Sequence, residues 1–239
     1  FTDSVDWVGA LFESYGARVT DERGNPTIRG NQALRQVMDY AVRLSRFLPN
    51  DVWAWDDAAN NRALISGRSA LIFNPPSARE VARRDAPQVA EKCWTIPMPA
   101  GPQGRFLAYL PWNSGIWSFG RNKPLAKQFL EFIAQREAAE LMSNTSNGYD
   151  IPPFDTMSDF KVWETEGPPV GTVFNYPNKP HHQAKAHIAF SPAPAELASQ
   201  MYIQALNTKV IARVAQGGET IEQALAWLER EITNMRRGG

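Results

Sequence analysis

Tryptophans that stand next to hydrogen-bonding side chains are the residues of this sequence best suited to binding a small molecule. One group contains Tyr109, Trp112, Asn113 and Ser114, in which Trp112 follows Pro111 and lies outside any run of regularly spaced apolar residues. An aromatic ring beside amide and hydroxyl groups can hold a molecule that has both apolar faces and hydroxyl edges, as a sugar does. The alternative is that Trp112 packs against the protein or lies exposed without a ligand.

Trp53, Trp55 and Asp56 form another group of this kind. The carboxylate of Asp56 could accept hydrogen bonds from two hydroxyl groups while an indole ring stacks on the apolar face of the same molecule. Alternatively, these residues form a packed loop in which Asp56 or Asp57 caps the next helix.

Other reactive residue types form no recognisable catalytic or metal-binding motif. The histidines in HHxxxxH, His181, His182 and His187, lack the spacing and the glutamate of a zinc protease, which favours a surface loop over a metal site. Cys93 is the only cysteine, which excludes an intrachain disulfide, and we expect a buried, unreactive thiol. There is no GxSxG motif and no phosphate-binding glycine loop, so no cofactor is predicted. Two carboxylates far apart in the chain could still form a glycosidase pair.

The composition excludes several classes of protein. The 239 residues include 25 basic and 25 acidic side chains, and this balance argues against a nucleic-acid partner. No apolar run reaches the roughly 20 residues that would cross a bilayer, so the chain is not itself membrane-spanning. The chain begins at Phe1 inside a helical pattern, and we therefore expect that an N-terminal part precedes it.

The elements that position these groups alternate between helices and strands. Helices are predicted where apolar residues recur at helical spacing: over 1–15, from Asn31 to Pro49, from Asp56 or Asp57 to Gly67, from Ser77 or Ala78, from Pro124 to about Thr145, over 197–210, and after a capping box of Thr220 and Gln223. Strands are predicted at 69–73, at 93–98, and in two pieces of 106–119 broken at Pro111. We expect Trp117, in one such strand, and Trp227, on a helix face, to be core residues.

The stretch 147–194 is rich in proline and has few periodic runs. We interpret it as a long connection and expect its aromatic side chains to anchor it to the rest of the protein. These are Phe154, Phe160, Trp163, Phe174 and Tyr176. Together with the alternation of helices and strands elsewhere, this pattern predicts an α/β architecture.

Several segments resemble, in order, family 1 of the bacterial extracellular solute-binding proteins, the family of maltose-binding protein and its sugar-binding relatives. They are WDDAANNRALISGRSALIFNPPSA, WTIPMPAGPQGR, SGIWSFGRNKPLAKQFLEFIAQREAAELM, SNTSNGYDIPPF and QGGETIEQALAWLEREI. The resemblance begins at a point within the C-terminal lobe of the family's members. About the first third of a typical member has no counterpart here.

The resemblance implies a type II periplasmic-binding-protein-like fold, in which two α/β lobes are joined by strand crossings. On this basis 1–110 would be the first part of the C-terminal lobe, 111–189 a segment of the N-terminal lobe with crossings, and 190–239 the closing helices of the C-terminal lobe. The first tryptophan group would lie on a crossing and face the cleft. The loop NPPSA, at a family position that often carries a binding aromatic residue, adds Asn74 and Ser77 as candidate ligand contacts.

The resemblance also implies a function. The chain would be the substrate-binding component of an ABC importer, not an enzyme, and would capture a sugar, polyol or related solute in the periplasm or outside the cell. Its other partners would be the transmembrane permease subunits. One alternative is a carbohydrate-active enzyme with a pair of carboxylates in a cleft. Another is a structural or sensor module that keeps the fold without a ligand.

Overall fold

The chain forms two compact units. A computed structural model describes residues 2–75, 77–93, 96, 98–108, 113–152, 154–165, 185–187 and 189–238. Unit 1 contains Phe1–Asn60, Met98–Leu110 and His181–Gly239, and unit 2 contains Asn61–Pro97 and Pro111–Pro180. This grouping places 61–97 with 111–180, whereas the sequence analysis placed 61–97 with 1–60. The assignment of either unit to a lobe stays a prediction.

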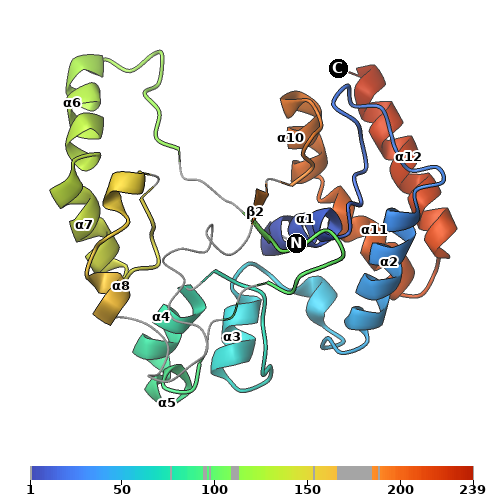
Figure 1. The fold of residues 1–239 in the computed structure, drawn as a ribbon, viewed down its shortest axis with the longest axis horizontal. Helices are drawn as coiled ribbons and strands as arrows, with labels where there is room; N and C mark the ends of the chain where they lie inside the picture. Colours follow the sequence, from blue (N-terminus) through green and yellow to red (C-terminus); the bar gives the residue numbers. More distant parts are fainter. Residues whose placement is uncertain are drawn as a thin grey trace. The chain divides into compact units, whose positions relative to one another are not determined.

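Unit 1 consists mainly of helices (Figure 1). These are α1 (Thr2–Ser14), α2 (Gln32–Ser45), the short helix η1 (Val52–Ala54), α10 (Ala195–Ile203), α11 (Leu206–Ala215) and α12 (Ile221–Gly238). Strands β1 (Phe106–Ala108) and β2 (Lys185–His187) pair in parallel, with Leu107 opposite Ala186. Parallel strands need a long crossover between them, and here the intervening sequence includes the second part of unit 2.

Local signals set the ends of these helices. Asn31 caps α2, because its side-chain oxygen accepts a hydrogen bond from the Leu34 amide at 3.2 Å. Gly16, with a φ of 70°, follows the end of α1. Thr220 and Gln223 form the predicted capping box of α12: the Thr220 amide donates to Gln223 at 2.8 Å, and the Gln223 amide donates to Thr220 at 3.2 Å.

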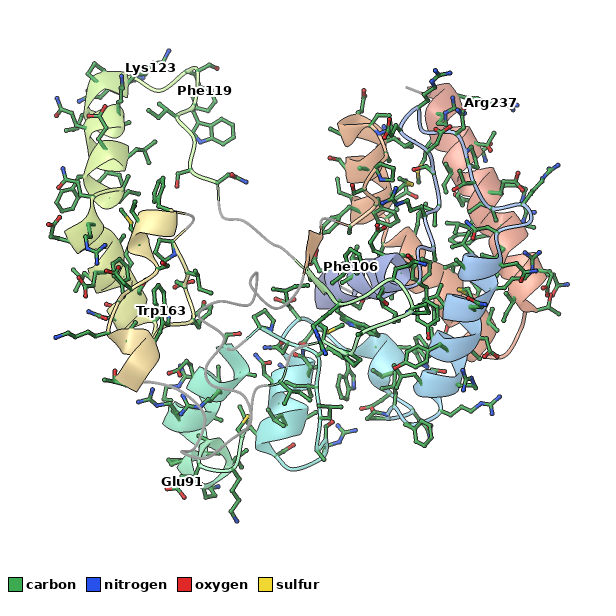
Figure 2. The ribbon with its side chains drawn as sticks, in the orientation of Figure 1. Glu91, Phe106, Phe119, Lys123, Trp163 and Arg237 are labelled. Atoms are coloured by element: carbon green, nitrogen blue, oxygen red, sulfur yellow. The ribbon has the colours of Figure 1, made fainter. Side chains whose placement is uncertain are left out.

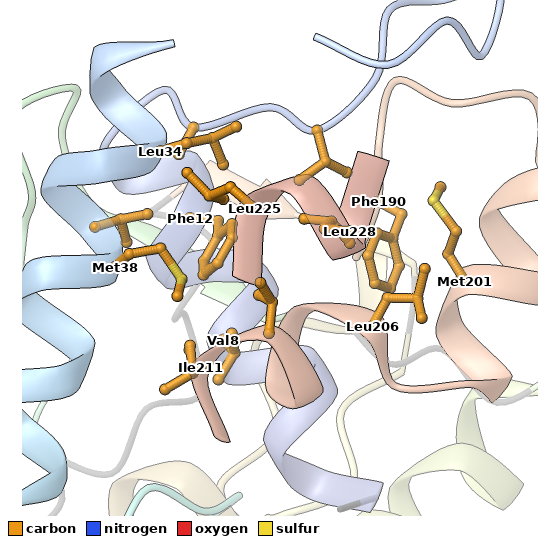
Figure 3. Close-up of a cluster of buried hydrophobic side chains, with 14 of the residues drawn as sticks. Val8, Phe12, Leu34, Met38, Phe190, Met201, Leu206, Ile211, Leu225 and Leu228 are labelled. Carbon is orange, nitrogen blue, oxygen red and sulfur yellow. The ribbon is translucent and has the colours of Figure 1, made fainter. Parts of the chain in front are cut away.

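The helices of unit 1 share one apolar core (Figure 3). Its members include Val8, Phe12, Leu34, Met38, Phe190, Met201, Leu206, Ile211, Leu225 and Leu228. A buried polar contact joins α1 to α11, since the Asn207 side chain donates to the Val5 carbonyl oxygen at 2.9 Å and accepts from the Thr208 amide at 2.8 Å. Trp227 packs against this core while staying partly exposed, and the Arg213 guanidinium lies 4.6 Å from the centre of its ring.

Unit 2 is a set of short helices with a much smaller core. They are α3 (Ala59–Ile65), which begins at the boundary with unit 1, α4 (Ser77–Asp85), α5 (Pro87–Ala90), α6 (Lys123–Ile133), α7 (Arg136–Thr145), η2 (Asp155–Met157) and α8 (Val162–Thr165). Its buried cluster contains Ala139, Phe160, Val162 and Trp163. The rings of Phe160 and Trp163 stack with centroids 5.3 Å apart. Within 147–194, therefore, Phe160 and Trp163 anchor the chain as predicted, Phe154 is exposed, and Phe174 and Tyr176 lie outside the described residues.

Most strand predictions are wrong for the residues described. Residues 69–73 form no strand, and neither do 113–119 nor the described residues of 93–98, namely Cys93, Ile96 and Met98. Only the piece at 106–108 is a strand. A strand needs a neighbour for its backbone hydrogen bonds, and none of the described residues pairs with these segments. For the same reason Trp117 is not a core residue: 73% of it is exposed.

Candidate ligand-binding site

Asn74 and Ser77 come together at the start of α4. The Asn74 amide group donates to the Pro75 carbonyl oxygen at 2.8 Å and to the Ser77 hydroxyl oxygen at 3.3 Å. Pro75 interrupts the preceding apolar run, and Ser77 begins the helix, so the local sequence places both side chains on one turn. Both are partly exposed. Their amide and hydroxyl groups are therefore close enough together to bind neighbouring hydroxyl groups of one ligand.

A network of charged and amide groups lies on the same helix, and sequence reasoning missed it. Glu80 accepts a hydrogen bond from the Asn147 amide at 2.7 Å and from Arg79 at 3.4 Å. Arg83 pairs with the same carboxylate at 3.6 Å. The i,i+3 spacing of Glu80 and Arg83 could have predicted their ion pair from the sequence. No sequence pattern could have predicted the contact with Asn147, which lies 67 positions further along the chain. Through the Asn147–Glu80 hydrogen bond, the network joins α4 to the turn after α7.

Trp53, Trp55 and Asp56 lie around η1 in unit 1. Both indole rings are half-buried, and the Asp56 carboxylate is on the exposed surface. Neither tryptophan belongs to the buried core of unit 1 as the structure describes it. The Asp56 carbonyl oxygen accepts a hydrogen bond from the Ala59 amide at 3.2 Å, so this residue also forms the turn that leads into α3. The group thus presents aromatic and carboxylate surface to solvent, as a stacking site requires.

The remaining predicted contacts are only partly described. Asn113 and Ser114 are exposed residues of unit 2, and Tyr109 and Trp112 lie outside the described residues. The structure therefore brings Asn74 to Ser77 and gathers the tryptophan group around η1. The complete site stays a prediction. Of the histidines, His181 and His182 also lie outside the described residues, and of His187 only the backbone, in β2, is described.

A shallow hollow of about 520 Å³ lies at the first turn of α6 and was not predicted. Ile116, Ser118, Lys123, Pro124 and Lys127 line it. Figure 2 labels Phe119 in the loop before the helix and Lys123 at the start of the helix. The lining combines the apolar residues Ile116 and Pro124 with Ser118 and two lysines. Sequence reasoning identified the helix start at Pro124 but assumed that the preceding residues were a buried strand.

Cys93 is less buried than the sequence analysis expected. Burial raises the pKa of its thiol, and the nearby positive charge of Arg79 lowers it by a smaller amount. The side chain is half-buried. A thiol with a raised pKa is protonated at neutral pH, and it is therefore a poor nucleophile.

No helix within the described ranges is both long enough and apolar enough to cross a membrane.

Comparison with known proteins extends over most of the chain. Residues 2–172 match the family model described as bacterial extracellular solute-binding protein. A probable ABC transporter-binding protein of Deinococcus radiodurans is 20% identical over 132 residues, which are 55% of this chain and 31% of that protein. A solved structure, maltose-bound T. maritima MalE3, matches with a TM-score of 0.68 and 17% identity over 97% of this chain and 57% of the other. The chain thus spans about a third of the curated relative, and the structural match confirms the expected periplasmic-binding-protein-like fold.

Proposed function

Because the chain belongs to the family of bacterial extracellular solute-binding proteins, we propose that it captures a small solute for the membrane permease of an ABC importer. The family match over residues 2–172 carries this proposal. The name of the Deinococcus relative supports a transporter role, and the maltose in the T. maritima structure supports a sugar or polyol as the solute. Such a protein works in the periplasm or outside the cell.

We further propose that aromatic stacking and short polar side chains share the recognition of the solute. Trp112, with Tyr109, Asn113 and Ser114, would supply one surface, and its ring would cover an apolar sugar face. Asn74 and Ser77 support the proposal through their closeness and partial exposure, because two neighbouring hydroxyl groups of a sugar need two closely spaced partners. Trp53, Trp55 and Asp56 would supply a further stacking and carboxylate surface.

Capture requires that the solute binds one conformation of the protein better than another. We propose that closure of two lobes around the solute provides this difference, since contacts made only in the closed form shift the population toward it. The permease would then recognise the closed form.

Thermal denaturation in the presence of candidate solutes tests the proposal. A solute at 100 times its Kd stabilises the native state by about 2.7 kcal/mol, which shifts Tm by roughly 5–10 °C in a protein of this size. The screen should contain sugars, polyols and their phosphates. If no compound in such a panel changes Tm, the proposed function is wrong.

Matched asparagine variants connect the binding to the proposed residues. Asn74→Ala and Asn113→Ala each remove one proposed hydrogen bond to the solute, so we expect about a fivefold weaker Kd for each. Asn144→Ala is the control, because Asn144 is an exposed asparagine on α7 that has no proposed contact with the solute. Equal affinities for all of these variants would contradict the assignment of the site.

The carbohydrate-active enzyme is the alternative from a different class. The family match favours binding without chemistry. Turnover of aryl glycosides by the purified protein would support the enzyme, whereas a ligand-dependent rise in Tm without turnover would support the importer component.

A further inference from the structure

Strands β1 and β2 are too short to hold each other in register by their own hydrogen bonds. Within the described ranges they form a sheet of two strands with three residues each. A two-stranded sheet is marginally stable at best in water, and parallel pairing is slightly weaker per residue than antiparallel pairing. Other contacts must therefore hold the pair, and α1 packs against both strands (Figure 1).

The loop 98–105, which leads into β1, caps the C-terminal end of α1. A helix leaves its last carbonyl oxygens without a partner inside the helix, and Ser14 is the last residue of α1. The Gln103 amide donates a hydrogen bond to the Ser14 carbonyl oxygen at 2.9 Å. Amide-to-carbonyl bonds in both directions between Gly101 and Gly104, at 2.9 and 3.0 Å, close the tight turn that carries Gln103. The segment GPQG, part of a motif that carries the family resemblance, therefore caps a helix that lies far from it in the sequence.

Gly101 lies so close to this helix end that it has no room for a side chain. A Cβ placed on it would be 2.7 Å from the carbonyl carbon of Ser14, which is closer than real Cβ atoms approach other atoms. At the base of the loop, the Arg105 side chain donates a hydrogen bond to the Met98 carbonyl oxygen. Because β1 begins directly after Arg105, the loop fixes where this strand starts along α1.

The second strand meets the same helix at Gly9. Ala189 follows the end of β2 by two residues and is 3% exposed. A Cβ placed on Gly9 would lie 3.0 Å from the Cβ of Ala189 and 3.1 Å from its Cα. Glycine is unfavourable inside a helix relative to alanine, so the close approach explains this residue and helix formation does not.

We propose that α1 and the loop 98–105 form a clamp that holds β1 and β2 in register, and that the clamp and both strands open as one cooperative unit. Gly9 and Ser14 lie on one helix, and a helix that fixes the position of each strand also fixes the offset between them. We call these contacts the α1 clamp: Gly9, Ser14, Gly101, Gln103 and Ala189. The chain passes from unit 1 to unit 2 after residue 110 and returns before residue 181, so the clamp holds the strands next to both crossings in the sequence.

Hydrogen exchange at single amides, measured by NMR on the protein without solute, tests the clamp. Gly9→Ala and Gly101→Ala each add one methyl group at one of the two contacts. Gly218→Ala is the control, because nothing lies within 4 Å of a Cβ at this position and its φ also lies outside the left-handed region. The double variant Gly9→Ala/Ala189→Gly restores the space that the methyl group at position 9 fills.

Each substitution should speed exchange at both strands, including the strand that it does not touch. We expect the protected amides of 106–108 and of 185–187 to exchange about fivefold or more faster in Gly9→Ala and in Gly101→Ala, while the amides of α12 change by less than about twofold. Gly218→Ala should leave all of these rates within about twofold of the parent. The double variant should exchange more slowly than Gly9→Ala alone.

Faster exchange confined to 106–108 in Gly101→Ala and to 185–187 in Gly9→Ala would overturn the proposal, since the strands would then be held separately. Equal acceleration in α12 would also overturn it, because the substitutions would then destabilise unit 1 as a whole. The parent protein gives a test that needs no variant: if the Gln103 amide exchanges as fast as an unstructured amide, the cap does not form. Solute is absent throughout, so failure here is distinguishable from failure of the proposed function.

Discussion

The indole nitrogen of Trp163 donates a hydrogen bond to the carbonyl oxygen of Gly148 at 2.8 Å, and both groups are buried. Gly148 has a φ of 84°, and it lies so close to the indole that a Cβ atom placed on it would be 2.8 Å from Cδ1 of Trp163. This contact holds the turn after α7 on the small core of unit 2. The turn also carries Asn147, which binds α4 through Glu80.

Replacing Gly148 by alanine should destabilise the protein more than the same change at a comparable glycine. Gly67 is the control: it has a φ of 75°, but nothing lies within 4 Å of a Cβ placed there. Gly67→Ala should lower the free energy of unfolding by about 1 kcal/mol through backbone strain alone. Gly148→Ala should lower it by about 3 kcal/mol, since the methyl group also collides with the indole. Urea denaturation followed by circular dichroism measures both losses, and equal losses would contradict the role of the contact.

The Glu80–Asn147 contact should contribute to stability as a coupled pair. Asn147 has a φ of 51°, so Asn147→Gly removes its amide while keeping a residue that tolerates this backbone conformation. We expect a loss of about 1.5 kcal/mol, because the lost hydrogen bond is to a carboxylate that is only 14% exposed. In a Glu80→Gln background the loss should fall to roughly half that value. A double-mutant cycle with fully additive effects would show that the two residues are not coupled.

Asp6 should make the protein less stable as the pH rises. Burial raises its pKa above 3.8, and the hydrogen bond from the Tyr202 hydroxyl, 2.9 Å away, lowers it by a smaller amount. The folded state therefore holds the proton more tightly than the unfolded state. The resulting stability is fully present below pH 3.8 and is lost as the pH rises through the folded pKa.

Asp6→Asn removes this dependence and keeps an oxygen that accepts from Tyr202. We expect the variant to have a higher Tm than the parent at pH 7 and an equal Tm near pH 3.5. The exposed Asp57→Asn serves as the control. A pH profile of Tm in which Asp6→Asn and the parent stay parallel would contradict the prediction.

The capping box of α12 should be worth about as much as a typical N-cap. Thr220→Ala removes the hydroxyl group that accepts from the Gln223 amide, and we expect a loss of about 1 kcal/mol. Thr220→Ser keeps the hydroxyl group, so its free energy of unfolding should stay close to that of the parent. If the two variants lost equal stability, the methyl group of Thr220 would matter and the cap would not.

Helix positions were largely predictable from the sequence, because their signals are local. Asn31, Pro124 and the pair Thr220 and Gln223 each lie within one turn of the helix start that they define. Two members of the small core of unit 2, Phe160 and Trp163, were also predicted from the sequence. They are aromatic residues in a stretch with little periodicity, so they were expected to pack against the protein. The family resemblance depended on the order of such local motifs along the chain.

Strands and contacts between distant residues required the tertiary structure. The apolar run 69–73 and residues 113–119 both have strand-like composition, but a strand exists only when another segment supplies its hydrogen bonds. Composition alone does not reveal whether such a neighbour is present. The same reason explains why Trp117 was predicted to be buried and is exposed.

By itself, the sequence determined the helix ends, the family and the residue types available for binding, because each of these depends on neighbours within a few positions or on their order. Only the tertiary structure decided that Asn147 binds Glu80 and that Trp163 packs on Gly148. The two contacts depend on how segments 15 and 67 positions apart pack together. Packing at that distance leaves no periodic pattern in the chain.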